Sequence, residues 1–538
     1  MSRKSRRMSA AGPVRGPSPA QAHAQPRPRT WTAYLDPTRY ALLAVLVGVA
    51  TYRFVVLADE AAPPGADPGN WLAFTHQLFG ASVKAADSLY FPVAPVLLKV
   101  LLAFLPTLTA TKVLGVAASV LMGVPFYLIL RRGCSPLFSA GLTLTFLLTG
   151  YQGETLSFGG YPQLLATTLL LLTVYWLMDG LISGARRPLL LAAVSTALVA
   201  GTHHFTLLLL APTLLVLGLA LFIQERPAVR PFLRNVLVWA LASAVFALPF
   251  LPWYVSFIGL MDGNPANANG FSVWDVDGVT AYVFEENRSF WVTFLVVAPA
   301  LSLVPLFSDK AARIRPAALA VLGGSLAGFL LTSEIRTAQL VEAGVVLSLG
   351  LPVAAVEQHL ARTRVQVTFR QVERLSLGLA VAGLLVVVGT SGHERFSNAL
   401  FRYQIVDASA LEALDWLREQ TPPGTRVMAN DSFTRVSYAW WVEGYAERPT
   451  YSLIEPDYLS FAEEKEQAAL AARLVDEETP PSEVEAILRE TGIEYIFLDK
   501  RTGGRFESLL SKTTFQLSLE NDHFAVVRLT RASAQAKP

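Results

Sequence analysis

The feature that most limits how this chain can fold is a series of long apolar runs through its middle. Many of these runs reach about 18 residues, close to the length that a helix needs to cross a hydrocarbon layer of about 30 Å. Charged residues make up only 16% of the 538 residues, against roughly 25% in a typical soluble protein. The charges lie between the runs and at the two ends, so the sequence predicts an integral membrane protein with many transmembrane helices.

The clear runs, about eleven in number, are predicted to be membrane spans. They begin near Tyr40, Val113, Pro136, Pro162, Leu189, Phe205, Val236, Phe290, Ala317, Ala338 and Leu375. One further segment, Phe91–Pro106, is ambiguous because it is short, is bounded by prolines and carries Lys99 in its middle. Whether this segment crosses decides the orientation of everything that follows it.

Positively charged linkers decide that orientation. If Phe91–Pro106 does not cross, the five strongly basic linkers face the same side as the N-terminus, as the positive-inside rule requires of cytoplasmic loops. They contain Arg131 and Arg132; Arg186 and Arg187; Arg226, Arg230 and Arg234; Lys310, Arg313 and Arg315; and Arg362, Arg364, Arg370 and Arg374. We therefore expect Phe91–Pro106 to be a juxtamembrane helix in the outer interface, with the N-terminus inside and the C-terminus outside.

The two ends of the chain differ from its middle. Residues 1–38 are basic and carry too few apolar groups to offset the entropy cost of ordering, which predicts a disordered cytoplasmic tail. Residues 39–391 form the predicted transmembrane domain, and residues 392–538 a soluble extracytoplasmic domain. The net charge of +2 does not indicate a nucleic-acid partner, and the single cysteine, Cys134, excludes an intrachain disulfide.

Helix and strand patterns alternate in the outer domain. Apolar residues recur at helical spacing over Ala408–Glu419, directly after Asp407, a suitable N-cap. The remaining patterns are a helix over Ser482–Glu490 and strands over Arg426–Ala429, Ile493–Leu498 and Phe524–Leu529. This alternation predicts a small α/β domain with a parallel or mixed sheet. It contains no glycine-rich nucleotide loop and no nucleophile elbow, so we expect a lid or binding domain rather than an independent enzyme.

Two stretches resemble a known superfamily. The first outer loop reads Asp67-Pro-Gly-Asn-Trp71, runs to Gly80, and continues as Tyr90-Phe-Pro-Val-Ala-Pro95 before the expected interfacial helix. The outer domain reads LEALDWLREQTPPGTRVMAND and is followed by Trp440, Trp441 and Gly444. Both resemble GT-C glycosyltransferases, multi-spanning enzymes that use polyprenyl-phosphate-linked sugars. The stretch YAWWVEGYAERP is also similar to the WWDYG element of oligosaccharyltransferases, but Val442 replaces its acidic residue.

The resemblance implies a function as well as a GT-C-like fold. It implies an inverting transfer of a sugar from a polyprenyl-phosphate-linked donor to an acceptor at the extracytoplasmic face, in the plasma membrane of a bacterium. The implied partners are the membrane lipid donor and a glycan, lipid or protein acceptor. Such a transfer needs a carboxylate to take the acceptor proton, a cation for the leaving phosphate and a groove for the lipid. A divalent metal, the donor sugar and the oligomeric state are left open.

Four outer carboxylates are candidates for catalysis. Asp67 is the first choice for the general base, because it matches the loop acid of the superfamily; the alternative is an ordinary loop aspartate before a proline. Asp59 and Glu60 leave the first predicted span and are candidates for binding a metal or orienting the acceptor, or are a solvated helix end. Glu154, in the second outer loop, stands where many relatives carry a second acid.

A second group of residues is expected to bind substrate. Arg336 is the candidate for the leaving phosphate, since a guanidinium matches phosphate oxygens and the residue lies in a short outer turn beside Glu334. A salt bridge between these two residues, or snorkelling of Arg336 to the interface, is the alternative. Trp71 and Tyr161, at the first and second outer loops, are the aromatic candidates.

Three further polar residues lie near the outer ends of spans. His203 and His204 are adjacent, so they cannot point the same way on a helix and are not expected to share a metal ion. A structural role is favoured for this pair, and the alternative is that one of them contacts the donor phosphate. Arg53, near the end of the first span, is expected to snorkel to the outer face in a structural role.

Two other functions are compatible with this sequence. A transporter or flippase for a lipid or glycan also needs many helices with scattered polar residues, but transporters commonly carry charge near the membrane midplane. Here the charges gather at one face, while the middles of the runs are Leu, Val and Ala, which favours surface chemistry on a lipid-borne substrate. A non-catalytic envelope assembly protein with a partner-binding outer domain is the third interpretation.

Overall fold

Long helices make up the first part of the chain. The computed structural model describes residues 37–260, 308–332, 337–362, 393–394, 396–430, 437–454, 459 and 461–530. The helices of the first part are α1 (Pro37–Ala58), α2 (Asp67–Leu78), α3 (Val93–Leu102), α4 (Thr107–Leu121), α5 (Gly123–Leu130), α6 (Pro136–Leu147), α7 (Gly150–Phe158), α8 (Tyr161–Ser183), α9 (Arg186–Ala200), α10 (His204–Glu225), α11 (Val229–Ala247), η3 (Leu248–Phe250), α12 (Leu251–Leu260), α16 (Asp309–Ala312), α17 (Arg315–Thr332) and α18 (Ala338–Arg362).

Six helical segments within the described residues are long and apolar enough to cross a membrane. They are Tyr40–Ala58, Thr107–Leu130, Tyr161–Ser183, His204–Glu225, Val229–Leu260 and Gln339–His359. They correspond to the predicted spans that begin near Tyr40, Val113, Pro162, Phe205, Val236 and Ala338. Of the other predicted spans, α6 and α9 have only 12 and 15 residues, and α17, of 18 residues, is not among the six. Those near Phe290 and Leu375 fall outside the described residues, so the total of about eleven stays a prediction.

The ambiguous segment Phe91–Pro106 contains the short helix α3. Its 10 residues cover about 15 Å at 1.5 Å per residue, about half of a hydrocarbon core. The helix is amphipathic in its burial: Ala94, Pro95 and Leu98 are buried against the protein, while Val100 is exposed. A helix of this length is too short to cross a hydrocarbon core, while the orientation derived from the basic linkers stays a prediction.

A five-stranded mixed sheet dominates the last part of the chain. Its elements are α20 (Ala408–Gln420), β1 (Arg426–Ala429), α21 (Ala439–Gly444), β2 (Thr450–Ser452), α22 (Ala462–Val475), α23 (Pro481–Thr491), β3 (Ile493–Asp499), η10 (Lys500–Phe506), α24 (Glu507–Lys512), β4 (Thr514–Glu520) and β5 (Phe524–Thr530). The strand order is β2-β1-β3-β5-β4, with β1 parallel to β2 and β3, and β5 antiparallel to β3 and β4. Strands β1, β3 and β5 and helices α20 and α23 lie where the sequence patterns place them, and Asp407 caps α20 by accepting a hydrogen bond of 2.8 Å from the Ala410 N–H. The sequence patterns did not reveal β2 or β4.

The two faces of the sheet pack against different partners, because side chains alternate along each strand. Phe497 and Val526 face the cluster that contains Trp441 and continues into the long helices. Their neighbours Ile496 and Val527 face the opposite cluster, which is covered by α22, α23 and α24. One face of the sheet therefore shares its core with the first part of the chain.

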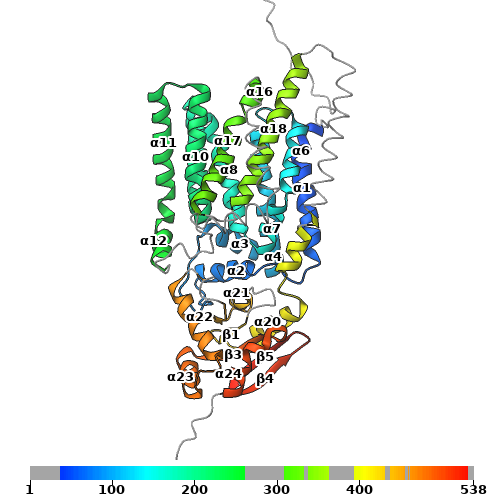
Figure 1. The fold of residues 1–538 in the computed structure, drawn as a ribbon, viewed down its shortest axis with the longest axis vertical. Coiled ribbons are helices and arrows are strands. Elements are labelled where there is room, and N and C mark those ends of the chain that lie inside the picture. The colour runs from blue at the N-terminus through cyan, green and yellow to red at the C-terminus, as the bar shows by residue number, and fades with distance from the viewer. Residues whose placement is uncertain are drawn as a thin grey trace, which may run out of the picture. The chain divides into compact units, whose positions relative to one another are not determined.

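Helices α2 and α21 make the closest contact between the two parts (Figure 1). A Cβ atom on Gly444 would lie 1.9 Å from the Gly69 carbonyl oxygen, and one on Gly69 would lie 2.7 Å from the Trp440 backbone. Glycine is therefore required at both positions for the helices to approach this closely. The two stretches that carry the GT-C resemblance thus meet in space, although Gly65 and Trp441, which are hydrogen-bonded there, are 376 residues apart in sequence.

Candidate active site

The first outer loop lies against the turn between α7 and α8. Gly65 and Gly159 both have positive φ angles, +90° and +95°. A Cβ atom on Gly65 would lie 2.2 Å from the Phe158 carbonyl oxygen, and one on Gly159 would lie 2.4 Å from Cδ of Pro68. Only glycine fits these positions. This contact places Asp67, the first residue of α2, beside the α7–α8 turn.

Two tryptophans fix the loop from opposite sides. The Trp71 indole N–H donates a hydrogen bond of 2.6 Å to the Gly159 carbonyl oxygen. The Trp441 indole N–H, from the outer part of the chain, donates one of 2.8 Å to the Gly65 carbonyl oxygen. Trp71 is buried, and its ring centroid lies 4.6 Å from that of Tyr90. Trp71 is a predicted substrate-binding residue, but its single hydrogen-bond donor is already bonded to the loop backbone and holds the loop in place.

Asp67 and Glu154, two of the predicted catalytic acids, both lie near Tyr403. Burial raises the pKa of the Tyr403 hydroxyl above its ordinary value, Glu154 and Asp67 raise it further, and Arg402 opposes them. The same segment is bonded to the loop, since the Gly65 N–H donates to the Tyr403 carbonyl oxygen at 2.9 Å. Both acids are half-buried. Two carboxylates, one at the start of α2 and one on α7, thus act on a phenol that stays protonated at neutral pH.

Glu154 reaches this position because of helical spacing. It lies one turn before Phe158 on α7, and residues four apart share a helix face. The Phe158 ring contacts the Tyr403 ring, with centroids 6.1 Å apart. Asp67 stands at the N-terminus of α2, where the helix dipole favours a negative charge. Local geometry therefore holds each acid in its place independently of the other.

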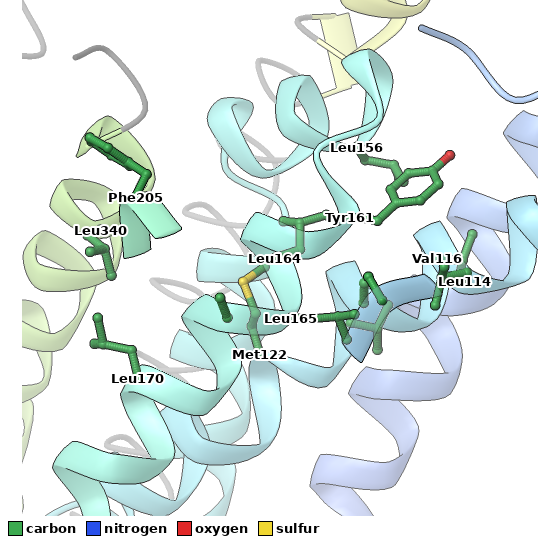
Figure 2. Packing of buried hydrophobic residues seen from close by; sticks show 14 of the residues in the cluster. Leu114, Val116, Met122, Leu156, Tyr161, Leu164, Leu165, Leu170, Phe205 and Leu340 are labelled. Carbon is green, nitrogen blue, oxygen red and sulfur yellow. The ribbon is translucent and has the colours of Figure 1, made fainter. Parts of the chain in front are cut away.

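Tyr161, a predicted substrate-binding residue, begins α8 and is fully buried. Its ring packs beside Leu156, and its hydroxyl points away from the other labelled apolar side chains (Figure 2). A Cβ atom on Gly115 would lie 2.6 Å from the ring, so α4 passes very close to it. No hydrogen-bond partner for the hydroxyl exists among the described residues, although the charge of Asp67 acts on it. Tyr161 therefore belongs to the wall of the Asp67 site.

Asp59 and Glu60 gather around a different residue. Both carboxylates act on Lys112 of α4, whose Nζ atom also donates to the Glu60 carbonyl oxygen at 2.7 Å. Asp59 is exposed and Glu60 is half-buried. Neither acid is among the groups that act on Tyr403. These two predicted catalytic residues thus form a cluster with Lys112 at the end of α1.

His203 and His204 lie at the start of α10 and have different surroundings. His203 is buried and caps the helix, with its Nδ1 atom accepting a hydrogen bond of 3.2 Å from the Thr206 N–H. The His204 ring lies between aromatic rings, 5.9 Å from that of Phe91 and 5.1 Å from that of Phe257. The cap gives His203 a structural role, which was the favoured prediction for this pair. A contact of either with a donor phosphate stays a prediction.

The predicted phosphate-binding pair Arg336 and Glu334 lies outside the described residues. Within the part of the chain that the structure describes, no three His, Cys, Asp or Glu side chains come together as they would around a metal ion.

Two buried cations were not predicted as functional residues. Lys84, in the first outer loop, contacts Glu443 at 2.8 Å and Glu464 at 3.7 Å, both from the outer part of the chain. Arg53 does not snorkel to the surface as predicted: it is only 2% exposed, and its Nη2 atom donates to the Leu147 carbonyl oxygen. The snorkelling prediction is wrong because the Arg53 guanidinium is buried against the last residue of α6. A basic residue inside an apolar run was the only signal for Arg53, and Tyr403 had none.

Comparison with known proteins gives a likeness of fold. No family model and no curated protein sequence matches the chain. Among solved structures, the archaeal oligosaccharyltransferase AglB from Archaeoglobus fulgidus, in complex with an inhibitory peptide and a dolichol-phosphate, is 14% identical with a TM-score of 0.55. That match covers 86% of this chain and 69% of AglB.

A second solved protein matches over nearly its whole length. ArnT from Cupriavidus metallidurans, bound to undecaprenyl phosphate, is 13% identical with a TM-score of 0.55, and the match covers 93% of this chain and 98% of ArnT. Its apo form is 15% identical with a TM-score of 0.54. Identities this low show the fold alone. At the level of fold, these matches agree with the resemblance that the stretch around Asp67 and the last part of the chain indicated.

Proposed function

We propose that this chain is a membrane glycosyltransferase of the GT-C type, which transfers a sugar from a polyprenyl-phosphate-linked donor to an acceptor at the extracytoplasmic face. The observation that carries the proposal is the convergence of Asp67 and Glu154 on Tyr403. Two predicted acids from separate loops meet there, next to the contact between α2 and α21. The likeness of fold to two proteins solved with polyprenyl phosphates supports the same class of donor.

The proposed reaction is a single displacement with inversion. Asp67 takes the proton of the acceptor hydroxyl as the acceptor oxygen bonds to the anomeric carbon of the sugar. The bond from that carbon to the phosphate oxygen breaks, and its electron pair leaves with the polyprenyl phosphate. General-base assistance of this kind contributes about 10²–10⁴-fold to the rate.

The neighbours of Asp67 have roles that follow from their chemistry. The Tyr403 hydroxyl, whose pKa is raised, remains a hydrogen-bond donor at neutral pH and is placed to orient a sugar or acceptor oxygen. Glu154, as the second acid, is proposed to hold the acceptor through another hydroxyl. Arg336 remains the proposed cation for the leaving phosphate, with Glu334 beside it.

The proposed topology puts this chemistry outside the cytoplasm. Residues 1–38 form the cytoplasmic tail, residues 39–391 the transmembrane domain of about eleven spans, and residues 392–538 the extracytoplasmic domain. In this arrangement α21 and the sheet form a lid over the Asp67 loop. Two observations support this arrangement: the five basic linkers all fall on one side under the positive-inside rule, and α21 packs against α2.

The test is the variant Asp67→Asn, which removes the proton acceptor but keeps the shape of the side chain. Release of polyprenyl phosphate from a panel of lipid-linked sugars, measured in proteoliposomes, should fall by about 10²-fold or more. Donor binding should change little, because the carboxylate acts on the acceptor. The matched control is Asp87→Asn, an exposed aspartate of the same loop, which should keep full turnover.

Retention of turnover by Asp67→Asn would show that the base is another residue, and Asp59, Glu60 and Glu154 would then be tested in that order. If all four acids tolerate substitution, the glycosyltransferase proposal fails.

A further inference from the structure

Helix α7, which carries Glu154, begins without a cap from its own sequence. Thr149 is in the N-cap position, but its side chain makes no capping hydrogen bond within the described part of the chain. The first four N–H groups of a helix have no partner within that helix, and a capping oxygen usually accepts from one of them. A helix of only 9 residues is also weak by itself, because isolated helices shorter than about 12–15 residues are marginal. The position of α7 therefore depends on what other elements supply.

Helix α18 supplies the cap of α7 from a distant part of the sequence. The Oε1 atom of Glu342 accepts a hydrogen bond of 3.4 Å from the N–H of Tyr151, the second residue of α7. The Oε2 atom of the same carboxylate accepts a hydrogen bond of 2.5 Å from the Thr149 hydroxyl. The helix dipole also favours a negative charge at this end of a helix. Glu342 thus holds both the N-cap residue and the first turn of α7.

Glu342 is an unusual residue for its surroundings. It is buried, and it lies in the 21-residue apolar segment Gln339–His359, one of the candidate membrane spans. A carboxylate in such a segment is costly unless it is hydrogen-bonded, and ionisable residues there are commonly functional. Gln339, one turn earlier on α18, donates from Nε2 to Oε1 of Gln152 at 2.9 Å. Two polar side chains of α18 therefore bond the first residues of α7.

The same helix makes a matching contact with α6. Glu357 follows Glu342 by 15 residues, which is about 22 Å along α18. Both of its carboxylate oxygens accept from the N–H of Ser135, at 3.2 and 2.9 Å. Ser135 is the N-cap residue of α6, and within the described part of the chain its side chain makes no capping hydrogen bond either. Glu357 is therefore a matched carboxylate on a helix start that carries none of the candidate acids.

We propose that Glu342 is a positioning residue for sugar transfer, and that it acts by holding Glu154 in place through α7. Glu154 lies three residues after Tyr151, in the turn that Glu342 caps. The other end of α7 is fixed separately, because the Trp71 indole N–H donates to the Gly159 carbonyl oxygen. A displacement of about 1 Å in a group that meets the substrate can cost about 10²-fold in rate. The inference rests on the proposed function for the role of Glu154, whereas the cap on α7 does not.

The first experiment is hydrogen–deuterium exchange of the full-length protein in nanodiscs, read by mass spectrometry. Glu342→Met removes the acceptor but keeps a chain of similar length, and it should speed amide exchange in α7 about 10-fold, because the Tyr151 N–H loses its partner. Glu342→Gln keeps a carbonyl oxygen for that N–H and should exchange almost as slowly as the wild type. The control Glu357→Met should speed exchange at the start of α6 and leave α7 unchanged. Unchanged exchange of α7 in Glu342→Met would overturn the proposal.

The second experiment measures release of polyprenyl phosphate from lipid-linked sugars by the same variants. Glu342→Met should lower kcat about 10-fold or more without changing KM for the donor, because the displaced acid meets the acceptor. Glu342→Gln should restore most of the rate, and Glu357→Met should keep it, although both Met variants remove a cap. Added to Glu154→Ala, the change Glu342→Met should cause little further loss, since the two residues act as a unit. Additive losses, or equal losses from Glu342→Met and Glu357→Met, would overturn the proposal.

A further variant and one comparison keep the two proposals separate. If Glu342→Met does not fold, Thr149→Val removes the shorter of the two hydrogen bonds from the side of α7, with the same expected directions. Faster exchange of α7 in either variant, in a protein whose wild type transfers sugar from no donor, would sustain the cap and refute the glycosyltransferase. Transfer by the wild type that is unaffected by both variants would sustain the enzyme and refute the positioning role.

Discussion

Lys84 and Arg53 are both buried cations, but their hydrogen-bond and ion-pair partners differ. The Lys84 ammonium is bonded to Glu443 at 2.8 Å and to Asn70 at 3.2 Å, lies 3.7 Å from Glu464, and sits 4.8 Å from the centroid of the Phe74 ring. Arg53 has one backbone carbonyl as a partner and one nitrogen with none among the described residues.

The difference separates a buried cation that is paired with carboxylates from one that is paired with none among the described residues. Lys84 joins the first outer loop to α21 and α22, so its carboxylate partners come from a part of the chain more than 350 residues away, as the separation of 359 residues to Glu443 shows. Burial alone would lower the pKa of Lys84, but the two carboxylates outweigh it and raise that pKa. Arg53 instead lines an apolar groove beside α1 and α6, and no carboxylate among the described residues pairs with it.

The largest expected effect that tests this contrast is that of Lys84→Met. The variant leaves the buried Glu443 carboxylate and the half-buried Glu464 carboxylate without their cation, which should destabilise the protein by about 3–5 kcal/mol. The measurement is the apparent thermal unfolding of the detergent-solubilised protein. Arg473→Ala, which removes an exposed ion pair with Glu483, is the control and should cost less than about 1 kcal/mol. A loss from Lys84→Met as small as that of the control would mean that the cluster does not hold the two parts together.

The same replacement at Arg53 should have the opposite sign. In protein stripped of lipid, Arg53→Met replaces an unpaired buried cation by an apolar chain of similar length and should stabilise the fold by about 1 kcal/mol. A marked loss of stability in the lipid-free variant would place Arg53 with Lys84 as a structural charge.

The smallest expected effect is a pH dependence of the Lys84 cluster. Burial raises the pKa of both Glu443 and Glu464 above 4.5, and Lys84 only partly opposes it. Between the ordinary and the raised pKa the folded state binds more protons than the unfolded state, so this contribution to stability is lost as the pH rises through that window. Glu464→Gln removes the carboxylate in excess of the one cation, so it should be more stable than the wild type at about pH 7.5, with a difference that shrinks toward about pH 5.

Glu478→Gln, at an exposed position, is the control for this titration and should show no such trend. A stability difference between Glu464→Gln and the wild type that stays constant with pH would contradict the raised pKa of the cluster.

Local patterns determined much of this protein before its tertiary structure was known. The six long helices follow from apolar runs, because a helix in lipid satisfies its own backbone and needs only apolar side chains around it. The Asp407 cap and the buried strand β3 also depend on residues close in sequence. The short loop motif around Asp67 was enough to indicate the fold family. Strand β4 could not be predicted from the sequence, because most of its residues are exposed and its apolar residues do not mark a buried face.

Only the tertiary structure decided which polar residues work together. Glu154 meets Asp67 beside Tyr403, whereas Asp59 and Glu60 gather at Lys112, and nothing in the spacing of these acids distinguishes the two pairs. The partners of Lys84 and Arg53 could not be predicted from the sequence either, since they come from distant segments of the chain. The physical reason is that hydropathy is a property of a run of neighbours, while the energy of a buried charge is set by whichever partners the fold places within a few ångströms.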